Sequence, residues 1–202
     1  MQAKEELVEA LEALGELLSA RELHFDLVVI GGGALLLHDF VSRATQDLDV
    51  VAQVEKNNLR KAKPLPDALV DAVRDVAAAL DLPRIPRDDK DWLNAGPAFL
   101  FDIGLPEGFM QRTAIHVFGA LTVRLASRQD LITLKLWAAT DTRRGTRRSV
   151  DIDDLRKLGP TQVELDVAVE WCARKDGRPE FENVEAAPVL ALLHVGAQGS
   201  DA

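Results

Sequence analysis

The stretch that decides the fold is LVVIGGGALLLHDFVSRATQDLDVVAQV, residues 27–54. It opens on four apolar residues, mostly β-branched, which is typical of a short buried strand. The glycines 31–33 follow, and Ala34–Phe40 is a strong helix-forming run. Leu48–Val54 then predicts a second strand. The order indicates a sheet whose strands are joined through a glycine turn and a short helix.

The glycine turn and the acidic pair downstream of it are the chemically informative parts of this stretch. Gly31 and Gly32 allow positive φ angles and let a ligand approach the backbone closely. The following helix N-terminus offers free N–H groups and a partial positive charge, which suit a phosphate. Asp47 and Asp49 form an Asp-x-Asp pair, and alternation along a strand places both carboxylates on one face, roughly 6–7 Å apart at the backbone.

The acidic pair predicts a divalent-cation site, because two neighbouring carboxylates repel each other unless a cation lies between them. Oxygen-only ligands favour Mg²⁺, or Mn²⁺ in its place. Asp102, in the apolar run FLFDIGL, is the candidate for a third ligand on an expected strand over Phe99–Ile103. A carboxylate without a partner is costly there, and metal ligation would explain it. Three carboxylates would complete a two-metal site for in-line displacement at phosphorus.

Each of these features also has a purely structural alternative. Glycines 31–33 alone are typical of a tight turn, and the acidic pair alone could lie on a solvated edge strand. Asp102 could be a strand-end residue paired with an arginine. Trp92 and Asn94 either wall a cleft or belong to a loop anchored by a buried tryptophan. The joint arrangement of glycines and acids favours the nucleotide–metal site.

Periodicity and capping signals predict the remaining elements as an α+β fold: a mixed β-sheet flanked by helices, with a helical C-terminal part. We expect a nucleotide-site core with an N-terminal helix over 1–126, helices over 127–176 and a loosely held tail over 177–202. Expected within these parts are helices at about 3–20, 65–80, 127–140, 151–158 and 161–175, a hairpin at 113–125, and loops at 54–66, 81–97 and 140–149.

Composition narrows the class of protein. The chain has 202 residues and a formal net charge of −9, which excludes a general polyanion binder but leaves a local basic patch open. Cys172 is the single cysteine, so neither an intrachain disulfide nor a cysteine-built zinc site can form. No apolar run approaches the roughly 18 residues of a membrane helix, and the acidic start does not resemble a signal peptide. We therefore expect a cytoplasmic protein without a membrane partner.

The pattern Gly-Gly, short helix, Arg-x-Thr-x-Asp-x-Asp resembles the DNA polymerase β-like nucleotidyltransferase superfamily. It looks most like the branch of abortive-infection (AbiEii-type) toxin nucleotidyltransferases, over roughly residues 25–158. The superfamily often has Gly-Ser at this turn, whereas here Gly-Gly precedes a third glycine, as in the toxin branch. The motif positions are Gly31, Gly32, Arg43, Thr45, Asp47 and Asp49.

A second stretch, residues 127–158, resembles the downstream segment of the same branch, a lysine helix followed by Arg and Asp-x-x-Asp. The likeness implies that Lys135 contacts the nucleotide triphosphate and that Asp151, with Asp154 beside it, supports the active site. Lys135 lies in an apolar helical run, so it either reaches the surface or points into a cleft. Four arginines between 143 and 148 form either a solvated loop or a phosphate contact.

The resemblance and the residues together predict a Mg²⁺-dependent nucleotidyltransferase that transfers a nucleoside monophosphate from an NTP to an acceptor hydroxyl. The acceptor could be a tRNA end or a protein side chain, and the protein could be a toxin with an antitoxin partner. The alternatives are a catalytically inactive nucleotide- or partner-binding module and a small-molecule modifier of the aminoglycoside type. The predicted catalytic residues are Asp47, Asp49, Asp102, Lys135 and Asp151, the metal ligands Asp47, Asp49 and Asp102, and the nucleotide-binding residues Gly31, Gly32, Arg43, Thr45 and Lys135.

Overall fold

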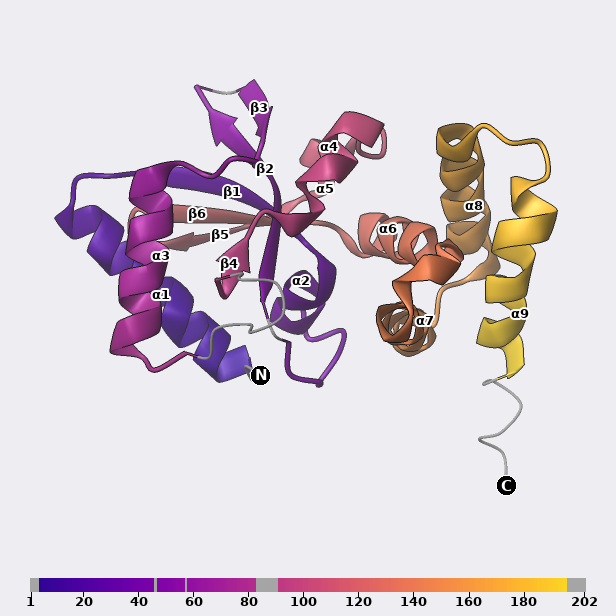
Figure 1. Cartoon of the computed structure of the whole chain (residues 1–202), viewed down its shortest axis with the longest axis horizontal. Helices are drawn as coiled ribbons and strands as arrows, with labels where there is room; N and C mark the ends of the chain where they lie inside the picture. The colour runs from indigo at the N-terminus through magenta and orange to yellow at the C-terminus, as the bar shows by residue number, and fades with distance from the viewer. Residues whose placement is uncertain (1–3, 46, 57, 83–90, 196–202) are drawn as a thin grey trace. The chain divides into compact units, whose positions relative to one another are not determined.

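The computed structural model describes residues 4–45, 47–56, 58–82 and 91–195. The chain divides into two compact units, Met1–Ser127 and Arg128–Ala202. The first unit holds the sheet, and the second consists of helices. Figure 1 shows both, with the strands in the first unit and α6 to α9 in the second. The predicted α+β class is confirmed.

The sheet of the first unit is mixed. Among the described residues its strands run in the order β3–β2–β1–β6–β5, with β4 also paired to β2. The pairs β1–β6 and β2–β4 are parallel, and the other neighbours are antiparallel. The predicted hairpin at 113–125 is confirmed as β5 and β6. The strands are β1 (Phe25–Ile30), β2 (Leu48–Glu55), β3 (Asn58–Lys61), β4 (Leu93–Asn94), β5 (Ala114–Phe118) and β6 (Leu121–Leu125).

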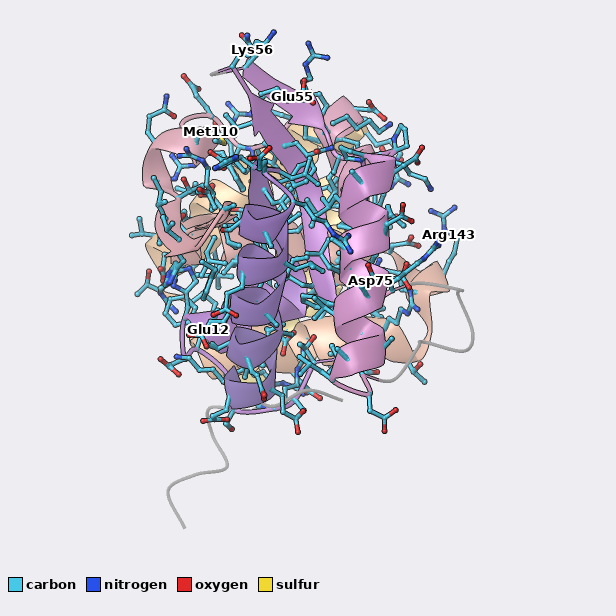
Figure 2. The ribbon with its side chains drawn as sticks, turned by 90° about the vertical axis from the view of Figure 1, so that its left-hand side faces the viewer. Glu12, Glu55, Lys56, Asp75, Met110 and Arg143 are labelled. Atoms are coloured by element: carbon cyan, nitrogen blue, oxygen red, sulfur yellow. The ribbon has the colours of Figure 1, made fainter. Side chains whose placement is uncertain are left out.

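Two amphipathic helices, α1 (Lys4–Ala20) and α3 (Asp67–Ala79), lie side by side against the sheet (Figure 2). Both are predicted by their apolar spacing, and the predicted faces are buried. Glu12 on α1 and Asp75 on α3 are exposed. The buried side chains of these helices include Leu7, Leu11, Leu14, Leu18, Leu69, Val73 and Val76.

The expected strand over Phe99–Ile103 is wrong, because this run forms the short helix α4. A five-residue apolar run is too short to separate a helical period from a strand. Pro97, in the 3₁₀ turn Gly96–Ala98 that leads into α4, is the helix-start signal that favours the observed structure. Gly104, with a φ of 91°, follows the last residue of the helix.

Three further expectations about loops are wrong in part. The expected loop 81–97 contains β4 and the start of the 3₁₀ turn Gly96–Ala98, and its residues 83–90 lie outside the described part of the chain. The expected loop 54–66 contains β3, whose alternate side chains are exposed, so apolar patterning could not reveal it. The expected loop 140–149 is a 3₁₀ turn, Thr142–Arg144, followed by the first turn of α7 (Thr146–Leu158). The helix α2 (Gly31–Leu37) also begins earlier than predicted, because the glycines themselves form its first turn.

The second unit packs α6 (Arg128–Thr140) against α7 and α8 (Gln162–Asp176). Thr161 and Glu164 form a capping box at the start of α8, as Thr161 predicts. Beyond residue 177, a π-helical turn, Glu182–Ala186, continues into α9 (Ala187–Val195). Phe181 and Val189 of this segment are buried, so part of it joins the apolar interior of the unit. In the described part of the chain, no helix is long and apolar enough to cross a membrane.

Gly15 is needed where α1 crosses the β5–β6 turn. A β-carbon at position 15 would lie 1.8 Å from the carbonyl oxygen of Phe118, a backbone atom that no side-chain rotation can move away. We expect Gly15→Ala to lower the free energy of unfolding by about 2 kcal/mol or more. This loss outweighs the gain of about 1 kcal/mol that alanine brings inside a helix.

Urea denaturation of Gly15→Ala measures this effect, with Glu12→Ala on the exposed side of the same helix as the control. The control should change the free energy of unfolding by no more than about 0.5 kcal/mol. A Gly15→Ala protein as stable as the wild type would contradict the close approach of α1 to the turn.

Candidate active site

The structure brings the glycine turn and the acidic pair together. The strands β1 and β2 are antiparallel, and Ile30 pairs with Asp49, so Asp49 lies beside the start of the glycine turn. Gly31 has a φ of 74°, and a β-carbon there would lie 2.5 Å from Oδ2 of Asp49. Only glycine leaves room for this carboxylate and adopts this backbone conformation without strain.

Arg43 and Thr45 lie over the second glycine. A β-carbon on Gly32 would lie 3.2 Å from Nη2 of Arg43 and 3.1 Å from Oγ1 of Thr45. Thr45 is buried, and its hydroxyl donates a hydrogen bond to the carbonyl oxygen of Asp47 at 3.1 Å. The Arg43 guanidinium therefore lies beside Gly32, the residue that follows the glycine against which Asp49 lies.

The predicted alternation at the acidic pair is confirmed. Asp47 and Asp49 are half-buried, whereas Leu48 and Val50 are fully buried in the core. Asp47 precedes the first residue of β2, and Asp49 is the second residue of that strand. The carboxylates therefore remain at the surface of the sheet while the residues between and after them anchor the strand.

Asn94 contacts Asp47 of the acidic pair, a role that the sequence pattern does not indicate. It lies on β4 in register with Asp49, and its Nδ2 donates to Oδ2 of Asp47 at 2.9 Å. Trp92 anchors this segment: it is buried, and its indole N–H donates to the carbonyl oxygen of Val73 at 3.0 Å. Of the two alternatives for this stretch, anchoring by a buried tryptophan is confirmed, whereas the expected loop is wrong at Leu93–Asn94, which forms β4. The strand β4, which Trp92 holds in place, brings the Asn94 amide to Asp47.

Asp102 has different surroundings from those expected. It lies on α4 rather than on a strand, its side chain is 60% exposed, and it forms a salt bridge with Lys61 of β3. Asp102 is therefore neither buried nor without a partner, and metal ligation is not needed to explain it. Among the residues that the structure describes, no three His, Cys, Asp or Glu side chains group as metal ligands. Metal binding by Asp102 stays a prediction.

The donor set of the acidic pair fits a hard divalent cation. Carboxylate oxygens are the ligands that Mg²⁺ takes in proteins, usually one or two of them together with substrate phosphates and water. Asp47 and Asp49 supply this number, and both remain partly accessible. The residues present fit one Mg²⁺ shared with a phosphate ligand.

His38 follows the last residue of α2 and is a packing residue. Its Nε2–H donates to the carbonyl oxygen of Ala126 at 3.0 Å, and its ring stacks on Phe40. Burial lowers the pKa of His38, although the hydrogen bond to Ala126 acts in the opposite direction. The end of α2 is thus held by the His38 ring, through its hydrogen bond to Ala126 and its stacking on Phe40.

In the second unit, Lys135 is enclosed by carboxylates. Its Nζ lies 2.7 Å from Oδ1 of Asp151 and 2.7 Å from Oδ2 of Asp154, and all three side chains are buried. Arg144 also reaches Asp151, at 3.1 Å. The alternative in which Lys135 extends to the surface is wrong, since its side chain is 10% exposed. The nucleotide contact of Lys135 and the supporting role of Asp151 stay predictions.

The arginines around Gly145 are partly tied to neighbouring groups. Arg143 is exposed and pairs with Asp141, and this hydrogen-bonded pairing lowers the pKa of the Asp141 carboxyl. Arg148 donates to the carbonyl oxygen of Ala139 at 2.7 Å. These contacts hold the turn between α6 and α7, and a phosphate contact by the arginines stays a prediction.

The chain belongs to a nucleotidyltransferase family. The family model described as a nucleotidyltransferase of unknown function, DUF6036, matches residues 5–168. The match spans the sheet, the glycine turn, the acidic pair and the lysine helix. No curated protein and no solved structure matches the chain. Membership of this family gives the class of protein, a nucleotidyltransferase, and does not assign the chain to a branch of the superfamily.

Removing the Lys135 charge should destabilise the second unit. Lys135→Met leaves the buried Asp151 and Asp154 without their shared cation, and breaking a buried pair in this way costs about 3–5 kcal/mol. The triple change Lys135→Met, Asp151→Asn and Asp154→Asn also removes the two acidic charges that lose Lys135 and should recover part of the loss, although Arg144 then loses Asp151 as a partner. Urea denaturation of both variants tests the pairing, and a Lys135→Met protein with wild-type stability would contradict it.

Proposed function

We propose that the protein is a Mg²⁺-dependent nucleotidyltransferase that transfers a nucleoside monophosphate from an NTP to an acceptor hydroxyl. The observation that carries the proposal is the contact of Asp49 with Gly31, next to Arg43 over Gly32. A carboxylate pair, a guanidinium and a turn of glycines without side chains are groups that suit a metal-bound phosphate ligand. Membership of the nucleotidyltransferase family supports the same reaction class.

In this proposal each residue of the site has a distinct role. Gly31 and Gly32 let a phosphate approach the backbone, and Arg43 balances its negative charge. Asp47 and Asp49 would hold Mg²⁺, which would supply positive charge to the phosphate oxygens and lower the pKa of the acceptor hydroxyl. The acceptor oxygen forms a bond to the α-phosphorus as the bond to the β-phosphate oxygen breaks. The hydroxyl proton passes to solvent water, and pyrophosphate leaves with the electron pair of the broken bond.

The acceptor and the biological role rest on the resemblance to the AbiEii-type branch. We propose a tRNA end or a protein side chain as the acceptor, and a toxin with an antitoxin partner as the biological setting. The cytoplasm is the compartment where NTPs and both acceptors meet. The competing candidate is a module that binds nucleotide without turnover, and the lack of a third grouped acid among the described residues favours it.

Transfer of label from each α-³²P NTP to total tRNA or to lysate protein, in the presence of Mg²⁺, tests the activity. Asp47→Asn and Asp49→Asn keep the side-chain shape but remove the charge, so each should reduce transfer at least about a hundredfold. Asp75→Asn, an exposed change on α3, is the control and should retain wild-type transfer.

Calorimetry with Mg²⁺ and NTP separates the two candidates. Binding without transfer to any acceptor would favour the non-catalytic module. Neither binding nor transfer by the wild type would overturn both the enzyme and the nucleotide-binding module.

A further inference from the structure

We infer that Asn94 is a positioning residue for the metal site: it orients Asp47 and occupies the place beside the acidic pair where a third carboxylate could stand. The inference rests on the proposed function, because it assigns a role within the same site. Asn94 is 7% exposed. Of the asparagines that the structure describes, it is the one that is buried. A buried amide requires partners for both its oxygen and its nitrogen.

The strand register brings Asn94 to the acidic pair. The strand β4 runs parallel to β2, with Leu93 beside Leu48 and Asn94 beside Asp49. Paired residues on adjacent strands place their side chains on the same face of the sheet, so Asn94 shares the face of Asp49. The N–H of Leu48 donates to the carbonyl oxygen of Trp92 at 2.6 Å, which fixes the start of this pairing.

Hydrogen bonding determines which way the Asn94 amide faces. Its Oδ1 accepts from the backbone N–H of Gly96 at 2.8 Å, and its Nδ2 donates to Oδ2 of Asp47 at 2.9 Å. The reversed amide would set a donor against the Gly96 N–H and an oxygen against a carboxylate. The backbone of the turn therefore aims the NH₂ group at Asp47, and one carboxylate oxygen of Asp47 is held in place.

Asn94 is neutral, so it adds no charge to the two carboxylates of the site. The amide satisfies one oxygen of Asp47 without adding a second positive charge that would compete with a cation, as lysine or arginine would. An aspartate at position 94 could still accept from Gly96, but its other oxygen would face Oδ2 of Asp47. Those two oxygens would repel each other unless a cation lies between them.

Two isosteric variants should therefore shift metal affinity in opposite directions. Asn94→Leu removes the donor that orients Asp47, and Mn²⁺ should bind about tenfold or more weakly. Asn94→Asp adds a carboxylate to the pair, and Mn²⁺ should bind roughly tenfold more tightly. In EDTA the Asn94→Asp protein should unfold at a lower temperature than the wild type, and Mn²⁺ should restore it. A purely structural role for Asn94 would not produce opposite shifts.

Titration of Mn²⁺ by electron paramagnetic resonance on the full chain measures these affinities, with circular dichroism as the check on folding. Asn58→Leu and Asn58→Asp, at an exposed position of β3, are the matched controls and should bind Mn²⁺ as the wild type does. A wild-type protein that binds no Mn²⁺, either alone or with NTP present, would overturn the proposed function, and this inference with it. If the wild type binds Mn²⁺ and both Asn94 variants bind it equally well, the proposed role of Asn94 is overturned while the proposed function stands.

Discussion

The antiparallel pairing of β1 with β2 is the constraint on which the candidate site depends. It places Ile30 beside Asp49, and the chain then turns at Gly31 with a positive φ and no side chain. The Asp49 carboxylate lies so close to this glycine that any β-carbon would displace it. The acidic pair and the glycine turn are thus one unit: the strand positions the acid, and the glycine leaves room for it. Arg43 and Thr45, from the loop between α2 and β2, then cover the next glycine.

Much of this arrangement could be predicted because it is encoded over a short range. Residues 27–54 contain a buried apolar strand, the glycines and an alternating acid–apolar strand, and each has a period or a residue type that dictates its local structure. The burial of Leu48 and Val50 with Asp47 and Asp49 left partly accessible follows directly from strand alternation. The capping box at Thr161 is equally local.

The features that could not be predicted depend on long-range contacts or on runs too short to show a period. Phe99–Ile103 is apolar enough for either a strand or a helix, and its salt bridge from Asp102 to Lys61 joins residues far apart in sequence. Asn94 lies on a strand of two residues, so no alternation could place it on the face of Asp49. Its partner Asp47 is 47 residues away along the chain.

Charge burial distinguishes the two units. In the first, the carboxylates of the acidic pair remain partly accessible next to a guanidinium, which suits a ligand that arrives from solvent. In the second, Lys135 satisfies Asp151 and Asp154 inside the helical unit, so the desolvation of each charge is offset by its neighbours. The same residue types therefore serve an open site in one unit and an internal ion cluster in the other.

The most direct test of the account is a crystal structure of the protein with Mn²⁺ and a non-hydrolysable NTP, with Mn²⁺ located by its anomalous scattering. We predict an anomalous peak within coordination distance of both Asp47 and Asp49. A phosphate of the nucleotide should lie beside Gly31, Gly32 and Arg43. Bound nucleotide whose Mn²⁺ contacts neither aspartate, or whose phosphates lie away from the glycine turn, would contradict it.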